Sequence, residues 1–376
     1  MKILFTGGGT GGHLFPIIAI VREIRSIYTK ADKLEFYYLG PKDEFSSLLL
    51  TQEGINVTTI FAGKVRRYLS IASIFQNIID VFFKTPLGLL QAFFHIFLVA
   101  PDVILSKGGY GSIPAVIAGW ILQVPIFLHE SDVVPGSTNK FLSRFALEIF
   151  VSFPVKETEF FPQRKMIATG NPIRKEITQG SLEEAKGLFK LTGEKPIVLI
   201  LGGSQGSQRI NDMLLQTMPE IFMDVELIHQ TGTKNAEQVK AEANVVIPDN
   251  LKKYYHPYSF LTEEGLRHAY RAASLVVSRA GSGSIFEIAA VGKPSILIPL
   301  SGSAQNHQLK NAYAYADKEA AIVIEEPNLT PHFFLERIKF LLANQPKLKA
   351  MSEAAREFSR PQAGRIIAEY ILTYLG

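Results

Sequence analysis

Two stretches decide the fold: ILFTGGGTGGH at residues 3–13 and VLILGGSQG at residues 198–206. Each is a short apolar run that leads directly into a glycine-rich loop, and a helical pattern follows each loop. A strand, a glycine loop and a helix form the opening unit of a doubly wound sheet, where glycine lets the backbone approach an anion at the helix N-terminus. Because this unit opens both halves, we predict an α/β protein with two Rossmann-like, doubly wound domains that face a ligand-binding cleft.

Apolar runs alternate with helical stretches along the rest of the chain, as parallel sheets covered on both faces require. The predicted strands are 2–6, 34–39, 103–106, 125–128 and 148–151 in the first half and 196–201, 226–230, 275–278, 295–298 and 321–324 in the second. The polar stretch 162–172 marks the expected boundary, so we predict a first domain over residues 1–163 and a second over 164–376. The final helix, at about 362–374, is a candidate to pack back on the first domain.

Composition excludes several classes of protein. The 376 residues include 39 basic and 35 acidic side chains, and the net charge of +4 is too small to argue for nucleic acid as a partner. Cysteine is absent, which rules out disulfides and thiolate metal sites and fits a reducing compartment. The apolar run Ile3–Phe5 is too short for a signal peptide, so we expect the chain to stay in the cytoplasm.

The pattern G-x-G-x-x-G at residues 7–12 also matches the dinucleotide fingerprint of a dehydrogenase. That fingerprint requires an acidic residue at the end of the second strand to hold the ribose. Here the second strand ends in Leu39-Gly40, and the nearest acids lie beyond the following proline. No Walker lysine follows the glycine loops at 7–12, 108–111 and 202–206, so these loops favour diphosphate binding of another kind.

An ordered set of short motifs resembles one known family. The motifs are GGGTGGH (7–13), GGYGS (108–112), HES (129–131), TNK (138–140), GNPIR (170–174), GGSQG (202–206), SRAGSGSIFE (278–287) and NHQLKNA (306–312). They are similar to the signature blocks of the MurG family of peptidoglycan N-acetylglucosaminyltransferases, in the same order from residue 2 to about 325. The resemblance implies the GT-B fold and a metal-independent, inverting transfer from UDP-N-acetylglucosamine to the C4 hydroxyl of the N-acetylmuramic acid of undecaprenyl-linked lipid I, which gives lipid II.

The resemblance also assigns roles in binding the UDP-sugar. The implied contacts are Thr10, Gly11, Gly12, Asp132, Arg174, Ser204, Leu261, Ser282, Gly283, Glu287, His307 and Gln308. Of these, Arg174 and Ser204 would hold the diphosphate, and Glu287 would accept both ribose hydroxyls. Leu261 would contact the uracil through its backbone.

The sugar end of the donor is assigned to two loops. Ser282 and Gly283 would bring backbone N–H groups to the sugar-phosphate, and His307 and Gln308 would hydrogen-bond the sugar hydroxyls. Many relatives carry an aspartate just before this last pair, near the place where Gln305 stands. We expect this difference to bear on sugar specificity.

The first domain is expected to hold the acceptor. The residues implied in acceptor binding are Gly8, Gly9, Thr10, Gly109, Tyr110 and Asn139. His13 closes the glycine loop and is the first candidate for the general base, because imidazole titrates near neutral pH. Glu130 is the alternative base, and the sequence does not choose between them. Asp132 stands where many relatives have asparagine.

A basic and aromatic segment in the first half suits contact with an anionic membrane. Its residues are Arg66, Arg67, Phe75, Ile79, Phe82, Phe83 and Lys84. The apolar stretch Thr85–Ala100 that follows is shorter than the roughly 20 residues of a helical span, so we predict a buried or membrane-touching helix. The implied location is the cytoplasmic face of the cell membrane, as a peripheral protein.

The partners that follow are UDP-N-acetylglucosamine, lipid I, an anionic membrane surface and other cell-wall synthesis proteins, with no nucleic acid, cofactor or metal. Two rival functions are weighed beside the lipid I transferase. One is a glycosyltransferase of the same fold with another acceptor, which would share the donor residues. The other is a nucleotide-sugar-binding or NAD-binding protein without transferase activity, which would be expected to lack His13 or Glu287; both are present.

Overall fold

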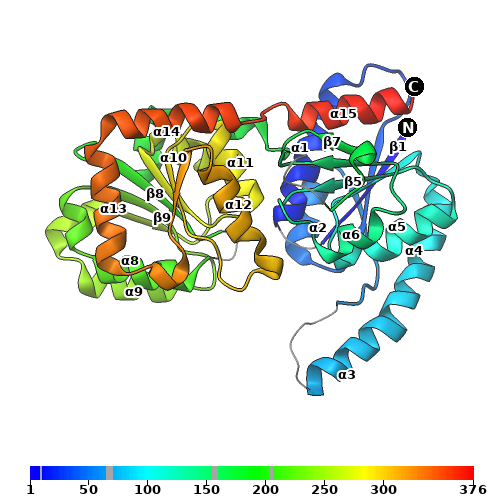
Figure 1. Cartoon of the computed structure of the whole chain (residues 1–376), viewed down its shortest axis with the longest axis horizontal. Coiled ribbons are helices and arrows are strands. Elements are labelled where there is room, and N and C mark those ends of the chain that lie inside the picture. Colours follow the sequence, from blue (N-terminus) through cyan, green and yellow to red (C-terminus); the bar gives the residue numbers. More distant parts are fainter. Residues whose placement is uncertain (9–10, 65–70, 155–159, 204–205) are drawn as a thin grey trace. The chain divides into compact units, whose positions relative to one another are not determined.

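The computed structural model describes residues 1–8, 11–64, 71–154, 160–203 and 206–376 (Figure 1). These residues form two compact units: Met1–Arg174 together with Gln362–Gly376, and Lys175–Pro361. Each unit contains one parallel sheet. The prediction of two Rossmann-like α/β domains is therefore confirmed.

The first unit is built on a seven-stranded parallel sheet in the order β3-β2-β1-β4-β5-β6-β7. Its strands are β1 (Lys2–Thr6), β2 (Glu35–Gly40), β3 (Asn56–Thr59), β4 (Val103–Ser106), β5 (Ile126–Glu130), β6 (Glu148–Val151) and β7 (Met166–Ala168). Ile3 and Phe5 of β1 enter one apolar core, and Leu4 enters another. Since successive side chains of a strand point to opposite faces, the sheet is buried on both sides.

Helices cover this sheet, and the last of them comes from the end of the chain. They are α1 (Gly11–Ile27), α2 (Glu44–Gln52), α3 (Ile71–Ile79), the π-helical turn η1 (Asp80–Lys84), α4 (Thr85–Val99), α5 (Ile113–Ile121), α6 (Ser137–Leu142) and α15 (Ala363–Tyr374). α15 packs against α1 and adds Ile367 and Ile371 to the core (Figure 1). The Tyr370 ring of α15 lies 5.7 Å from that of Phe127 and 5.4 Å from that of Phe150, so aromatic contacts hold the helix to the sheet.

The division between the units falls after Arg174, later than the boundary expected after residue 163. The reason is β7, which pairs with β6 and extends the first sheet beyond that point. Arg174 therefore belongs to the first unit, although the sequence grouped it with the second domain.

The second unit contains a six-stranded parallel sheet in the order β10-β9-β8-β11-β12-β13. Its strands are β8 (Ile197–Leu201), β9 (Glu226–Gln230), β10 (Tyr255–Tyr258), β11 (Leu275–Ser278), β12 (Ser295–Leu297) and β13 (Ala321–Val323). Its helices are α7 (Leu182–Phe189), α8 (Gln208–Thr217), α9 (Ala236–Val246), α10 (Glu263–Ala272), α11 (Ser282–Ala290), α12 (His307–Ala316), α13 (Pro331–Ala343) and α14 (Gln345–Phe358). In each sheet the first strand lies centrally and the chain crosses to both sides of it, which creates a topological switch point at its carboxyl end.

Three strands that the sequence did not predict all lie at sheet edges: β3, β7 and β10. β3 has the sequence NVTT and no fully buried residue, and β10 contains Pro257. Edge strands tolerate polar side chains and proline because one side of the strand needs no hydrogen-bonded neighbour. Their sequences therefore lack the apolar run by which the central strands are recognised.

The apolar helix of the first unit is longer than expected. A continuous helix covers Phe75–Val99, because the π-helical turn of η1 joins α3 to α4 without a break. This helix of 25 residues is long and apolar enough to cross a membrane, by length and composition alone. Most of the helix is exposed. The prediction that this apolar segment is too short for a span is therefore wrong about its length.

Candidate active site

The glycine loops of the first unit gather at the carboxyl edge of its sheet. They follow β1 and β4, which are neighbours, and β4 is followed in the sheet by β5, which ends at Glu130. This edge, at the switch point, is where doubly wound sheets bind ligands. Gly9 and Thr10 lie outside the described residues, whereas Gly8, Gly11 and Gly12 lie within them.

His13 lies in the first turn of α1, with its imidazole against the two glycine loops. A Cβ atom on Gly8 would be 3.2 Å from His13 Nδ1, and one on Gly109 would be 3.5 Å from His13 Nε2. A side chain at position 8 would therefore crowd the ring, whereas the approach at position 109 is an ordinary contact. Burial, with a smaller contribution from the Lys107 ammonium, lowers the pKa of His13 to about 4. The imidazole is consequently neutral at pH 7 and carries a nitrogen that can accept a proton.

Glu130 ends β5 and its carboxylate is surrounded by donors. Oε1 accepts the backbone N–H of Asp132 at 3.0 Å, and Oε2 accepts Asn139 Nδ2 at 2.9 Å and the backbone N–H of Gly136 at 3.2 Å. The side chain is 4% exposed. Burial, followed by the Asp132 carboxylate, raises the pKa of Glu130 to about 7, against the hydrogen bonds and the charge of Lys107. Glu130 thus fixes the loop that follows β5.

Asn139 links this loop to the second glycine loop. It is 4% exposed and lies at the start of α6, and a Cβ atom on Gly108 would come within 2.7 Å of its Cγ. Gly108 and Gly109 both have positive φ angles, of 82° and 79°, which favour glycine. Asn139 also donates to Glu130, so its amide group joins the loop after β5 to the second glycine loop.

Lys107 is a member of this site that the sequence analysis missed. It follows β4, is 4% exposed, and its ammonium donates to the Ser131 hydroxyl. Burial lowers the pKa of Lys107 to about 8, although the Glu130 and Asp132 carboxylates oppose that shift. In the sequence, its position directly before the Gly108 loop could have indicated a role in the site. That position becomes informative only when β5, which ends at Glu130, is known to be the neighbour of β4.

The other first-unit residues predicted for substrate are spread around this edge. Tyr110 begins a short 3₁₀ helix (Tyr110–Ser112), and its ring lies 6.0 Å from the Lys64 ammonium. Arg174 is buried, and its guanidinium lies over the Phe15 ring of α1 at 4.1 Å. Arg174 is thereby held beside the helix that starts at the first glycine loop.

The corresponding edge of the second sheet begins with the loop after β8. Ser204 and Gln205 of that loop lie outside the described residues. The loop ends at Ser207, whose hydroxyl accepts the Ile210 N–H at 3.3 Å and so caps α8. Arg279, just after β11, donates to the Ser207 hydroxyl at 2.6 Å and pairs with Glu326 at 2.5 Å. Arg279 was not among the predicted site residues, although it lies within the motif SRAGSGSIFE (278–287).

Helix α11 presents the next set of predicted residues. It begins after Gly281 with no side-chain cap, and Ser282 is buried in its first turn. The backbone N–H groups at this end therefore point toward the carboxyl edge, as an anion site requires. Glu287 lies further along the helix and accepts the Tyr270 hydroxyl at 3.4 Å.

Leu261 is tied to the β8 loop through a residue that the sequence analysis did not select. Gln230, at the end of β9, accepts the Leu261 N–H at 3.2 Å through its side-chain oxygen. The same side chain donates to the Gly203 carbonyl at 2.9 Å. Gln230 thus sets the spacing between the glycine loop and the segment predicted to contact uracil.

The turn before α12 brings the predicted sugar-binding pair to the same edge. Gln305 and Asn306 have left-handed backbone conformations, with φ of 56° and 54°. His307 Nδ1 lies 2.8 Å from the Ala304 carbonyl, and Gln308 accepts the Leu300 N–H at 3.0 Å. Within the described part of the chain, no group of three or more histidine, aspartate or glutamate side chains is placed to hold a metal ion.

Two family models match this chain, one in each half. The glycosyltransferase family 28 N-terminal domain matches residues 3–151, and the glycosyltransferase family 28 C-terminal domain matches residues 197–366. A UDP-N-acetylglucosamine--N-acetylmuramyl-(pentapeptide) pyrophosphoryl-undecaprenol N-acetylglucosamine transferase of Bacillus thuringiensis (strain Al Hakam) is 34% identical over 98% of this chain and 99% of its own length. The protein with that activity in Borrelia turicatae is 34% identical over 100% of this chain and 97% of its own.

The chain belongs to this family of N-acetylglucosamine transferases. The resemblance inferred from the motifs is thereby confirmed, and the protein is a glycosyltransferase.

Solved structures of similar fold include other sugar-nucleotide enzymes. MurG of Acinetobacter baumannii has a TM-score of 0.73 at 24% identity and covers 99% of both chains. The UDP-GlcNAc 2-epimerase from Neisseria meningitidis bound to UDP-GlcNAc has a TM-score of 0.68 at 12% identity, covering 99% of this chain and 100% of its own. At these identities the likeness shows the fold alone, and the GT-B fold predicted for a member of the transferase family is confirmed.

Proposed function

We propose that this protein transfers N-acetylglucosamine from UDP-N-acetylglucosamine to the C4 hydroxyl of the N-acetylmuramic acid of undecaprenyl-linked lipid I, with inversion at the sugar C1, giving lipid II. The observation that carries the proposal is the 34% identity over 98% of the chain to a transferase with this printed activity. The two carboxyl edges described above supply residues suited to each substrate.

In this proposal the donor binds at the carboxyl edge of the second sheet. The uncapped N-terminus of α11 offers N–H groups to a phosphate, and Glu287 offers two oxygens to the ribose hydroxyls. The loop that contains Ser204 follows β8, and Gln230 holds the adjoining Gly203 and Leu261. Oriented dipoles and N–H groups stabilise the charge that develops on the UDP leaving group.

The acceptor in turn occupies the carboxyl edge of the first sheet. The neutral His13 imidazole accepts the proton from the attacking hydroxyl, because its nitrogen is uncharged at pH 7 and its ring borders both glycine loops. Glu130 serves as a positioning group, since three N–H donors already occupy its carboxylate. Asn139 donates to Glu130 and lies against Gly108, so it holds the acceptor loops together. Arg174 contributes a guanidinium for a diphosphate.

We also propose that the first unit binds an anionic membrane surface peripherally, on the cytoplasmic face. The exposed apolar side chains of α3, η1, α4 and α5, here called the apolar surface, are Phe75, Ile78, Val81, Phe82, Phe83, Leu87, Leu90, Phe94, Phe97, Leu98, Trp120 and Ile121. Exposed apolar side chains in this number are typical of a membrane or protein contact. Ile79 is half-buried, and Arg66 and Arg67 lie outside the described residues.

One face of the long helix is anchored to the protein, which favours lying on the membrane over crossing it. Ala92 and Ile96 of α4 are fully buried in the core of the first unit, and a Cβ atom on Gly88 would collide with the Phe61 carbonyl oxygen. Lys84 pairs with the buried Asp80 at 2.6 Å. The opposite, apolar face is left to the bilayer interface, where the lipid-linked acceptor resides.

Donor binding and turnover can be separated by variants. His13→Ala should lower kcat by about 10²–10⁴-fold, as loss of a general base does, with UDP affinity unchanged in calorimetry. Glu287→Ala should weaken UDP binding by about tenfold or more through the lost ribose hydrogen bonds. His332→Ala and Glu336→Ala, both exposed on α13, are the matched controls. Full turnover by His13→Ala would exclude His13 as the base, and unchanged UDP affinity in Glu287→Ala would exclude the ribose role.

A further inference from the structure

A large pocket opens at the amino edge of the second sheet, away from the proposed donor site. Its volume is about 820 Å³, and it lies beside Pro196, Ser274 and Pro294, which directly precede β8, β11 and β12. Helix α11 shows the separation clearly, because it begins with Ser282 at the carboxyl edge and its last residue, Ala290, lines the pocket. The pocket is therefore a second site and no extension of the first.

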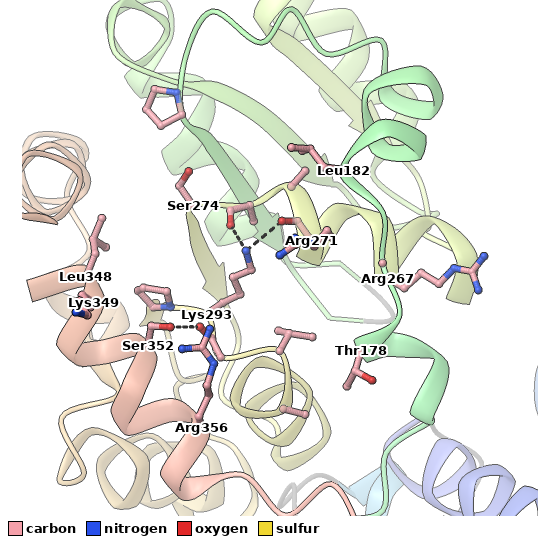
Figure 2. Close-up of a pocket in the computed structure, with 18 of the residues that line it drawn as sticks. Thr178, Leu182, Arg267, Arg271, Ser274, Lys293, Leu348, Lys349, Ser352 and Arg356 are labelled. Carbon is pink, nitrogen blue, oxygen red and sulfur yellow. Dashed lines mark hydrogen bonds between the residues drawn. The ribbon is translucent and has the colours of Figure 1, made fainter.

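The lining of this pocket is strongly basic. It contains Arg267, Arg271, Lys293, Lys349 and Arg356, and no aspartate or glutamate is among its lining residues in the described part of the chain. Figure 2 shows Arg271, Lys293 and Arg356 around the middle of the pocket, with Arg267 and Lys349 toward opposite ends. Three separate helices or loops thus bring positive charge to one cavity.

Lys293 shows how crowded these charges are. Its ammonium donates to the Ala273 carbonyl at 2.6 Å and to the Arg271 carbonyl at 3.1 Å, at the end of α10 (Figure 2). Burial, followed by the charges of Arg271 and Arg356, lowers the pKa of Lys293 to about 8. Like charges held together in this way favour the binding of an anion, which would offset their repulsion.

The three central cations lack acidic partners. Across residues 1–8, 11–64, 71–154, 160–203 and 206–376, no carboxylate forms an ion pair with Arg271, Lys293 or Arg356. Lys349, at one end of the pocket, lies 4.0 Å from Glu353, and both side chains are largely exposed. No ion pair within the described chain therefore neutralises the central cations of the pocket.

Ser352 and Gly292 shape the pocket beside the central cations. Ser352 donates to the Gly292 carbonyl at 2.6 Å, which fixes the turn after α11 against α14 (Figure 2). Gly292 has a φ of 62°, and a Cβ atom there would lie 2.6 Å from Arg356 Nε. Glycine therefore allows the Arg356 side chain to pass close to the backbone beside Lys293.

We propose that this pocket binds an anion that carries at least two phosphate groups, held by Arg271 and Arg356 with Lys293 between them. Guanidinium groups bind phosphate oxygens in pairs, which suits two arginines on separate helices. A pocket of this size holds a ligand larger than one phosphate ion. The two phosphates come from a soluble metabolite or from a lipid headgroup, which share this chemistry.

The first test is calorimetric titration of the full chain with inorganic pyrophosphate and without UDP, because UDP itself carries two phosphate groups. Binding of pyrophosphate at the proposed donor site is common to the wild type and the variants, so it does not affect their comparison. Saturable binding is expected, and the double variant Arg271→Ala/Arg356→Ala should weaken it by about tenfold to a hundredfold. Arg337→Ala on α13, outside the pocket, is the matched control and should bind as the wild type does. Near-ultraviolet circular dichroism and UDP affinity report whether the variants keep their fold.

A parallel titration with vesicles that contain cardiolipin, whose headgroup carries two phosphate groups, distinguishes the source of the anion. Dependence of vesicle binding alone on Arg271 and Arg356 would assign the pocket to a lipid headgroup, and dependence of pyrophosphate binding would assign it to a solute. If the double variant matches the wild type in both titrations, the proposal is overturned. A failure of UDP to bind would count against the proposed donor site only, since the comparison between variants still reports on the pocket.

Discussion

Activity should depend on the ionisation of Glu130, close to neutral pH. Burial and the Asp132 carboxylate raise the pKa of Glu130 to about 7. In its ionised form this carboxyl accepts N–H groups from Asp132, Gly136 and Asn139, so the charged form holds the loop after β5 in place. Protonation places a hydrogen on one of these oxygens, weakens the loop contacts, and should lower the rate of transfer.

The size of the effect follows from the pKa. With a pKa of about 7, roughly 76% of Glu130 is ionised at pH 7.5 and roughly 9% at pH 6, so kcat/KM should fall about eightfold between these values. His13 contributes no such change in this range, because its pKa of about 4 leaves the imidazole neutral throughout. The assay is initial-rate transfer from pH 5.5 to pH 8.5 at constant ionic strength.

Two variants show whether Glu130 is the group whose ionisation controls the rate. Glu130→Gln cannot ionise and should show a low rate without an acid limb, whereas Glu336→Gln on the exposed face of α13 should keep the wild-type profile. A wild-type kcat/KM that is constant between pH 6 and pH 7.5 would refute the reasoning. So would an unchanged acid limb in Glu130→Gln, because another group would then be titrating.

Three further predictions concern the charge, the surface and the packing of the first unit. Lys107→Met removes a positive neighbour, so the pKa of Glu130 should rise and the acid limb should move to higher pH by about one unit. Phe82→Ser combined with Phe83→Ser should release the protein from phosphatidylglycerol vesicles in a sedimentation assay, with UDP binding unchanged, because both rings are exposed on the apolar surface. Gly88→Ala should lower the free energy of unfolding by about 1–3 kcal/mol in urea titration, because the added methyl group collides with backbone and displaces α4.

Matched substitutions make each of these results interpretable. Lys318→Met, at an exposed position, should leave the pH profile where it is. Phe340→Ser on α13 should leave vesicle binding unchanged, and equal loss in both aromatic variants would contradict the role of the apolar surface. Gly187→Ala in α7, where a Cβ atom meets nothing within 4 Å, should stabilise by about 0.5–1 kcal/mol, and a similar gain in Gly88→Ala would contradict the packing argument.

The central strands of both sheets were predictable because their burial leaves a continuous apolar run. β1 and β8, which open the two units, are almost wholly buried and lead into glycines. The edge strands were missed because one edge and one face can be polar, as in NVTT of β3. The length of the Phe75–Val99 helix was also missed, since Asp80 and Lys84 interrupt the apolar pattern but pair with each other within the helix.

The location of the candidate residues was predictable from the motifs, whereas contacts that depend on a neighbouring strand were not. His13 and Asn139 were expected from the motifs, and the structure places both beside the glycine loops of the first sheet. Lys107, Gln230 and Arg279 were missed, because each acts through contacts between loops that follow different strands. Their partners are distant in the sequence and become neighbours only through the strand order.

The most direct test of the proposed activity is transfer of radiolabelled sugar from UDP-N-acetylglucosamine to a lipid I analogue, in buffer with EDTA. The proposal predicts a labelled disaccharide-lipid product, formed at the same rate with or without the chelator. No product from a protein that binds UDP would contradict the lipid I acceptor, and product that disappears with EDTA would contradict the expected metal-independent reaction.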